Sequence, residues 1–237
     1  MALRPAIAQP LVQGFAAAFT RPTFKRFLTL MAGALLNTGR RTISHLLRSL
    51  GGLAPGHPSS YHRVFSRRFW SPVTRARVLA GAVLQRFAAH VVVPLAGDDT
   101  VDEHRGETVY GKGRHRDPVR STQSSTAWRW GPKWVVLAVL VRFPFAARPW
   151  ALPVLVALDR TPAWNRAHAR PHKTPARLRR QLVALRMRWF PQGRFLLAGD
   201  GGYGSQEMAR FAHRHRRRLA LISRFTPTAN LYEPPLP

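Results

Sequence analysis

Two stretches decide the fold: PLAGDDT, residues 94–100, and FLLAGDGGYG, residues 195–204. In each, an apolar run typical of a buried β-strand ends in glycine and aspartate. A carboxylate that follows a buried strand is held rigidly while its oxygens face a crevice at the end of the sheet. The two stretches therefore predict strands whose aspartates, Asp99 and Asp200, meet at one edge of a sheet.

The segments around these stretches predict a mixed α/β order after residue 90. Their composition, rich in β-branched residues and leucine, predicts strands over 91–96, 133–143, 150–158, 194–198 and 219–224. Apolar residues at helical spacing predict helices over 175–190 and 205–217. Between the first two strands, residues 102–131 form a long glycine- and charge-rich excursion. The order is therefore β, excursion, β, β, α, β, α, β.

The first 89 residues predict a basic helical region that binds DNA. Helices are expected over 23–36, 40–50, 61–70 and 72–89. The first places Leu28 and Leu35 on its inner face, and the second turns Arg40, Arg41 and Arg48 outward. Two helices across the turn at residues 37–39 are typical of a helix-turn-helix reader, and equally of a plain helical bundle with a solvated basic face.

Charge narrows the range of partners. The 237 residues hold 38 Lys or Arg against 10 Asp or Glu, a net charge of +28, and no acidic residue precedes Asp98. A phosphate backbone explains this scarcity of acids, because each neutralised phosphate releases counterions; an anionic membrane surface is the alternative. Prolines and arginines interrupt the apolar run 134–158, so no membrane span is expected. The N-terminus is a poor signal peptide, which predicts a cytoplasmic protein.

The two aspartates predict a metal site. Carboxylates on neighbouring strands repel each other unless a cation lies between them. Without cysteine, hard oxygen ligands remain, and these favour Mg²⁺. The alternative is that Asp99 caps a turn and Asp200 caps the following helix.

This arrangement resembles the DDE-superfamily transposases of bacterial insertion sequences. GDDT, then an excursion that contains HRDPVRST (residues 115–122), two apolar strands, a helix and DGGYG stand in the order of that family's core. The resemblance covers residues 91–225 well and the N-terminus more loosely. It implies an RNase H-like fold, α/β with a mixed sheet flanked by helices, behind a helical domain.

The family uses three carboxylates to hold two Mg²⁺ (or Mn²⁺) ions. Carried over, Asp99 is the first carboxylate, Asp200 is the second, and Asp98 is either a neighbour or a substitute. For the third, Glu207 lies on the wrong helix and Glu233 lies among prolines that forbid a helix. The chain therefore resembles a C-terminally truncated transposase with an incomplete site.

The resemblance also implies partners. It predicts Mg²⁺-dependent cleavage and transfer of DNA at element ends and target, and it is compatible with a homodimer at the nucleoid.

We expect domains over 1–89, 90–225 and a proline-rich tail over 226–237. DNA contacts are predicted at Arg40, Arg41, Arg48, Arg114, Arg116, Arg120, Lys133, Arg179 and Arg180. A non-catalytic nucleic-acid-binding protein and an RNase H-like nuclease are the alternatives.

One aromatic segment has two interpretations. AWRWGPKW, residues 127–134, interleaves Trp128, Trp130 and Trp134 with Arg129 and Lys133. The pattern predicts a strand that enters an aromatic-lined core, and stacking on unpaired bases is the alternative.

Overall fold

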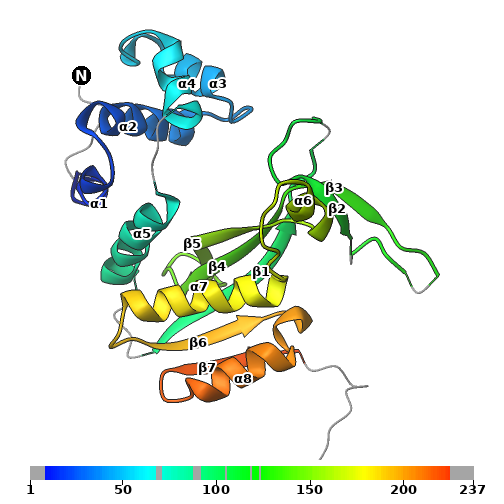
Figure 1. Cartoon of the computed structure of the whole chain (residues 1–237). Helices are drawn as coiled ribbons and strands as arrows, with labels where there is room; N and C mark the ends of the chain where they lie inside the picture. Colours follow the sequence, from blue (N-terminus) through cyan, green and yellow to red (C-terminus); the bar gives the residue numbers. More distant parts are fainter. Residues whose placement is uncertain are drawn as a thin grey trace, which may run out of the picture. The chain divides into compact units, whose positions relative to one another are not determined.

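A computed structural model describes residues 9–67, 71–87, 92–104, 106–117, 119–122 and 124–224 (Figure 1). The chain divides into two compact units, Met1–Ala82 and Val83–Pro237. The division falls within a helix, a few residues before the expected boundary at 89. The proline-rich tail and Glu233 lie outside the described residues.

The first unit is helical. Its elements are α1 (Gln9–Gln13), α2 (Arg21–Leu36), α3 (Ile43–Leu50), α4 (Pro58–Ser66) and the greater part of α5 (Pro72–Phe87), with short 3₁₀ turns at Ala16–Ala18 and Gly51–Leu53. Local chemistry sets the starts of two of them. The Thr42 hydroxyl accepts a hydrogen bond from the His45 N–H at the start of α3, and Pro58 opens α4. Among the described residues, no helix is long and apolar enough to cross a bilayer.

The three helices α2, α3 and α4 share one core. Leu30, Leu46, Tyr61 and Val64 are buried together, and Gly33 lets α2 approach α3 so closely that a Cβ there would lie 2.7 Å from the Leu46 carbonyl oxygen. This packing is that of a small bundle, and a helix-turn-helix role stays a prediction. The expected burial of Leu28 is confirmed, whereas that of Leu35 is wrong, because its side chain is 81% exposed. The other buried residues of α2 are Thr23, Thr29, Leu30 and Gly33.

The second unit is built on a five-stranded sheet in the order β5-β4-β1-β6-β7. Its strands are β1 (Val92–Val101), β4 (Lys133–Val141), β5 (Trp150–Asp159), β6 (Arg194–Gly199) and β7 (Leu219–Ser223). β1, β4 and β5 pair antiparallel, whereas β6 lies parallel to β1 and β7 parallel to β6. This mixed order confirms the predicted RNase H-like α/β fold.

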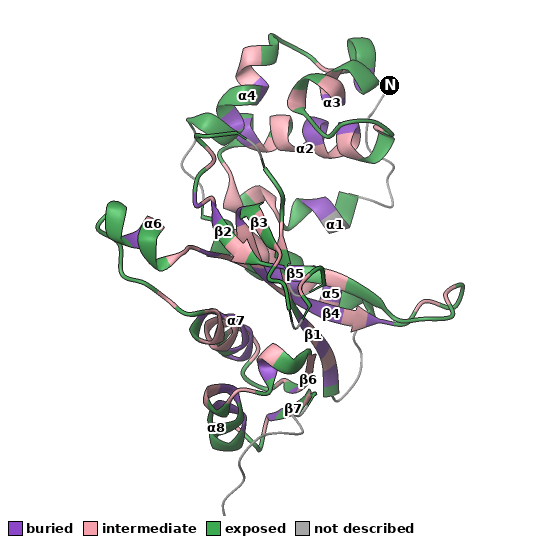
Figure 2. Ribbon diagram, turned by 90° about the vertical axis from the view of Figure 1, so that its right-hand side faces the viewer, coloured by how far each residue is buried: buried purple, intermediate pink, exposed green. Residues whose placement is uncertain are grey.

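Helices cover one face of this sheet. α7 (Pro175–Trp189) packs against β4 and β5, and α8 (Gln206–Arg214) packs against β7; Figure 2 shows both on the same side of the sheet. Strand alternation then sorts the side chains of β1. Val93 and Leu95 face the helices and are at most 6% exposed, whereas Val92 faces the other way and is 43% exposed. We call these the helix face and the open face.

The excursion contains two short strands: the first was not expected, and the second lies within the segment 127–134, which was expected to enter an aromatic-lined core. β2 (Gly113–Arg116) and β3 (Trp128–Gly131) form an antiparallel ribbon, which Figure 1 shows projecting from the main sheet. The short helix α6 (Pro162–Ala167) was also missed. β2 holds no large apolar residue, and in β3 the alternation of tryptophan with arginine spans only three residues, which is too short for the usual strand signal.

Arg186 of α7 is a charged side chain in an aromatic environment. Helical spacing places it on the polar side of α7, but its side chain is fully buried, over the rings of Phe190 and Phe195 at 4.1 and 5.4 Å. Among the described residues its guanidinium nitrogens have no hydrogen-bond partner. Burial lowers the pKa of Arg186 to about 10, so the fold disfavours its charge.

Replacement of Arg186 by methionine is therefore expected to raise the free energy of unfolding at neutral pH by ~1–3 kcal/mol. Because the pKa of the folded state is lowered, the parent protein gains stability as the pH rises above about 10, and R186M lacks this gain. Urea unfolding at several pH values measures both effects. The exposed Arg188 on the same helix supplies the control, since R188M changes stability by only about 0.5 kcal/mol or less. Equal changes in both variants would contradict the prediction.

Candidate active site

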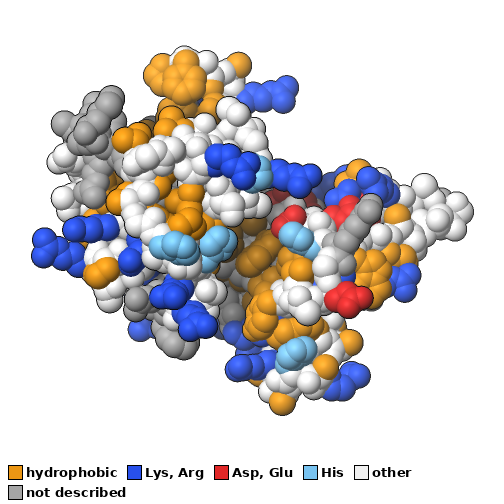
Figure 3. Space-filling view, turned by 90° about the horizontal axis from the view of Figure 1, so that it is seen from above, with side chains coloured by type: hydrophobic (Ala, Val, Ile, Leu, Met, Phe, Trp, Pro, Cys, Tyr) orange, Lys and Arg blue, Asp and Glu red, His pale blue; other side chains and the backbone are white. Residues whose placement is uncertain are grey.

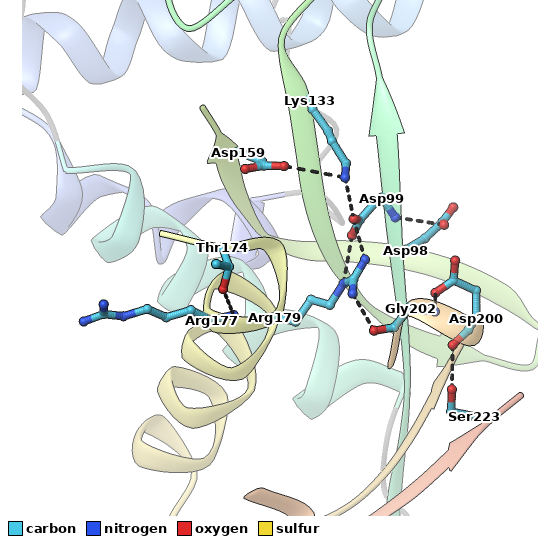
Figure 4. A network of polar contacts seen from close by, with 10 residues as sticks. All are labelled: Asp98, Asp99, Lys133, Asp159, Thr174, Arg177, Arg179, Asp200, Gly202 and Ser223. Atoms are coloured by element: carbon cyan, nitrogen blue, oxygen red, sulfur yellow. Dashed lines mark hydrogen bonds and ion pairs between the residues drawn. The ribbon is translucent and has the colours of Figure 1, made fainter. Parts of the chain in front are cut away.

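The register of two strands places Asp98 beside Asp200. Gly97 of β1 pairs with Gly199 of β6 in parallel, so the next residue of each strand is an aspartate at the same edge of the sheet. The backbone of Asp200 is still extended, at φ −67° and ψ −174°. Alternation sends both side chains toward the open face, and Figure 4 shows them on the same side of the strand ends, away from Lys133.

Asp99 points the other way, into the helix face. Its carboxylate accepts two hydrogen bonds from Arg179, at 3.2 Å from Nε and 2.6 Å from Nη2. Lys133 Nζ lies 3.1 Å from the same carboxylate and 3.5 Å from that of Asp159. With its side chain 11% exposed, Asp99 is held by two cations in a nearly buried network.

Asp98 and Asp200 have a different environment. Both are exposed, and across the described ranges no Lys or Arg nitrogen lies within ion-pair distance of either one. Asp98 Oδ1 accepts the Asp99 N–H at 2.8 Å. Asp200 Oδ1 accepts the Gly202 N–H at 3.0 Å. At least one oxygen of each carboxylate faces solvent without a protein donor in the described residues.

The capping interpretation is partly right for Asp200. Its side chain caps the 3₁₀ turn Gly201–Tyr203, whereas Ser205 caps α8 through the Met208 N–H. The cap uses one carboxylate oxygen, so it does not exclude a metal on the other. Asp99, in contrast, caps nothing and is paired with Arg179 and Lys133.

Tyr203 is a site residue that the sequence analysis missed. Its side chain is 1% exposed, lies against Gly97 and Gly199, and packs under the guanidinium of Arg179 at 4.7 Å. Burial, followed by the negative charge of Asp99 and more weakly of Asp200 and Asp98, raises the pKa of the Tyr203 phenol well above its usual value. The DGGYG motif carries the residue, but only the register shows that two glycines make room for its ring.

Gly97 tests this packing. A Cβ at position 97 would clash with the Tyr203 ring, so Gly97→Ala is expected to lower the free energy of unfolding by ~1–3 kcal/mol. Urea unfolding followed by circular dichroism measures the loss. Gly201→Ala is the control, because open space surrounds that position. If G97A unfolds like the parent protein, the ring does not fill the space between the strands.

Among the predicted DNA contacts of the second unit, two belong to the site: Lys133 and Arg179 bind Asp99. Arg180 pairs with Glu207 at 3.1 Å, which occupies that carboxylate on α8. Arg120 lies 3.8 Å from Asp117.

The remaining predicted contacts are exposed: Arg40, Arg41, Arg48, Arg114 and Arg116. The exposure of these arginines does not test DNA binding, which stays a prediction.

A metal would have two carboxylates here. In the part of the chain that the structure describes, no group of three or more His, Asp or Glu side chains is placed to hold an ion. Asp98 and Asp200 nevertheless offer hard oxygens on neighbouring strands, the ligands that Mg²⁺ accepts with water in its other positions. The residues present therefore fit a partly hydrated divalent cation.

Comparison with known proteins identifies the family of this chain. No curated protein matches the chain. A family model described as DDE superfamily endonuclease matches residues 14–237, which include both aspartate-bearing strands and most of the helical unit. The chain therefore belongs to the DDE superfamily endonucleases.

Proposed function

We propose that the protein is a transposase-type nuclease that cleaves and joins DNA with Mg²⁺ or Mn²⁺, at the ends of a bacterial insertion sequence. The observation that carries the proposal is the pairing of Gly97 with Gly199, which directs Asp98 and Asp200 to the same open face. Two neighbouring carboxylates repel each other unless a cation lies between them. Such a pair is notable in a chain with a net charge of +28. In Figure 3, basic side chains recur over the visible face, whereas acidic ones occupy a small part of it.

The metal-binding pair in this proposal is Asp98 and Asp200. For Asp99 to bind an ion, it would have to leave Arg179 and Lys133 and turn from a nearly buried position. That exchange leaves two cations beside a metal, which costs several kcal/mol. Asp98 needs no such exchange. We assign Asp99 the role of positioning residue, since its own backbone N–H donates to Asp98.

The chemistry follows from charge. Mg²⁺, when bound, activates water or a DNA 3′-hydroxyl and stabilises the leaving oxygen. Asp98 and Asp200 hold the ion, while Arg179 and Lys133 neutralise Asp99 so that it does not add a third negative charge. The basic surface binds the phosphates of the DNA. Transposition further implies a homodimer that brings two element ends together.

The number of carboxylates limits activity. With two carboxylate ligands in the described residues, we expect weak metal occupancy and slow cleavage, with DNA binding largely kept. Mn²⁺ is the useful probe, because its paramagnetic broadening of nearby resonances reports binding even where turnover is slow.

The test combines binding and cutting. Purified protein at stoichiometric concentration is mixed with supercoiled plasmid and Mg²⁺, with EDTA as control, and Mn²⁺ broadening is measured on the same sample. Broadening at Asp98 and Asp200 with metal-dependent nicking supports the proposal. DNA binding without either effect would identify a non-catalytic nucleic-acid-binding protein, and cleavage confined to RNA–DNA hybrids would identify an RNase H-like nuclease.

A further inference from the structure

The ribbon β2–β3 presents an aromatic and cationic face. Register pairs Arg114 with Trp130 and Arg116 with Trp128, and cross-strand partners lie on the same side of a ribbon. Since residues two apart also share a side, all four side chains belong to one face. All four are exposed, Trp128 by 47% and Trp130 by 55%. We call this face the Trp–Arg face.

Cations accompany the rings. The Arg114 guanidinium lies 4.2 Å above the Trp128 ring, and Lys112 Nζ lies 5.9 Å from the centre of the Trp130 ring. The predicted aromatic-lined core is therefore wrong for these two tryptophans: they face solvent beside positive charge. Exposed paired tryptophans are unusual on a protein surface unless they bind something.

The reverse side of the ribbon holds the platform rigid. Arg129 Nε lies 2.6 Å from Asp117 Oδ2, whose side chain is only 3% exposed. The segment after β1 adds backbone hydrogen bonds, from the His104 N–H to the Trp130 carbonyl and from the Asp102 N–H to the Pro132 carbonyl, each 3.0 Å long. Gly131 permits this close approach, since a Cβ there would clash with Asp102. Little ordering is therefore needed when a ligand binds.

We infer that the Trp–Arg face binds unpaired nucleobases of a DNA strand, by stacking on Trp128 and Trp130 while Arg114 and Arg116 contact phosphates. Indole rings stack on any base, and arginines between them supply the cations that a phosphate backbone requires. Backbone positions two residues apart on a strand are spaced by about 6.7 Å, a spacing that allows neighbouring unstacked nucleotides each to reach one ring. β3 continues through Pro132 into β4, whose first residue, Lys133, pairs with Val101, three residues beyond Asp98. The platform therefore extends from the end of β1 that carries Asp98.

This inference rests on the proposed function for its substrate, but its test does not require catalysis. Binding is measured by fluorescence anisotropy in EDTA with two probes: a blunt DNA duplex, and the same duplex with a single-stranded thymidine tail. The parent protein is expected to prefer the tailed probe. The double variant W128A/W130A is expected to lose affinity for the tailed probe by about 10-fold or more and for the blunt probe by less than about 2-fold.

Two further variants keep the result interpretable. Trp150→Ala removes a tryptophan of matched exposure, 52%, at the opposite end of the sheet, and it should leave the preference intact. W128F/W130F retains stacking and should keep much of the preference, even if the alanine variant folds poorly. Equal losses on both probes, or a preference that survives W128A/W130A, would overturn the inference. A change of oligomeric state in W128A/W130A, seen by sedimentation, would likewise overturn it and identify a protein interface.

A failed cleavage assay leaves this result standing, because no metal is present in it. A lost preference for the tail, in turn, leaves the Asp98 and Asp200 pair untouched.

Discussion

Asp98→Asn is expected to weaken Mn²⁺ binding by at least about 100-fold, because removal of a direct ligand exceeds the loss seen for outer-shell partners, and to abolish plasmid nicking. Asparagine keeps the size of the side chain and its hydrogen bond to the Asp99 N–H, so the change removes charge and little else. Calorimetry and paramagnetic broadening measure the affinity, and stoichiometric nicking measures the chemistry. Asp200→Asn should behave alike, since both carboxylates face the same side.

Two matched variants serve as controls for this result. Asp102→Asn removes a carboxylate on the same segment that is 61% exposed and lies 3.1 Å from His104, and it should leave metal affinity unchanged. Asp99→Asn should mainly lower stability, because it leaves Arg179 and Lys133 without their shared anion. If Asp99→Asn removes metal binding and Asp98→Asn does not, the ion lies on the helix face and the assignment of the pair is wrong.

The choice between the two aspartates shows where sequence reasoning ends. The apolar run before GDDT predicts a buried strand that ends in carboxylates. The structure confirms the strand, but β1 continues past both aspartates to Val101. The apolar run does not show which aspartate faces which side of the sheet. Alternate residues of a strand face opposite sides, but the two sides differ only once a helix covers one of them. Here α7 covers the side of β1 on which Leu95 lies. Gly97 and Asp99 lie on the same side, because every second residue of a strand faces the same way. Asp98 is thereby left on the open face.

Long apolar runs explain why the main sheet was predictable. β4 is a nearly continuous run of valine and leucine, and the edge strand β5 is rich in the same residues, a composition that is typical of strands. The ribbon β2–β3 lacks that signal, since its outward residues are arginine and tryptophan. The burial of Arg186 could not be predicted either. Its position on the helix predicts an exposed side chain, and only the rings of Phe190 and Phe195 in the structure show why it is buried.

Arg179→Met is expected to lower the free energy of unfolding of the second unit by about 3–5 kcal/mol, the usual cost of removing one partner from a buried pair. Arg179 is 10% exposed and binds both Asp99 oxygens, and its Nη1 donates to the Gly202 carbonyl oxygen at 2.5 Å. Burial works against its charge, but the hydrogen bonds and charge of Asp99 prevail and raise the pKa of Arg179. Methionine preserves the apolar packing against Tyr203 and deletes the charge alone.

A double-mutant cycle isolates the pair from the rest of the site. In R179M/D99N both partners are uncharged, so the loss should be at least about 1 kcal/mol smaller than the sum of the two single losses. Arg180→Met is the matched control: Arg180 is the next residue of α7, is 40% exposed and pairs with Glu207, and such a surface pair contributes at most about 1 kcal/mol. Urea unfolding of the full chain, followed by circular dichroism, gives all four values. Additive losses in R179M/D99N would mean that Arg179 and Asp99 act separately, and Asp99 would then be free to turn toward a metal.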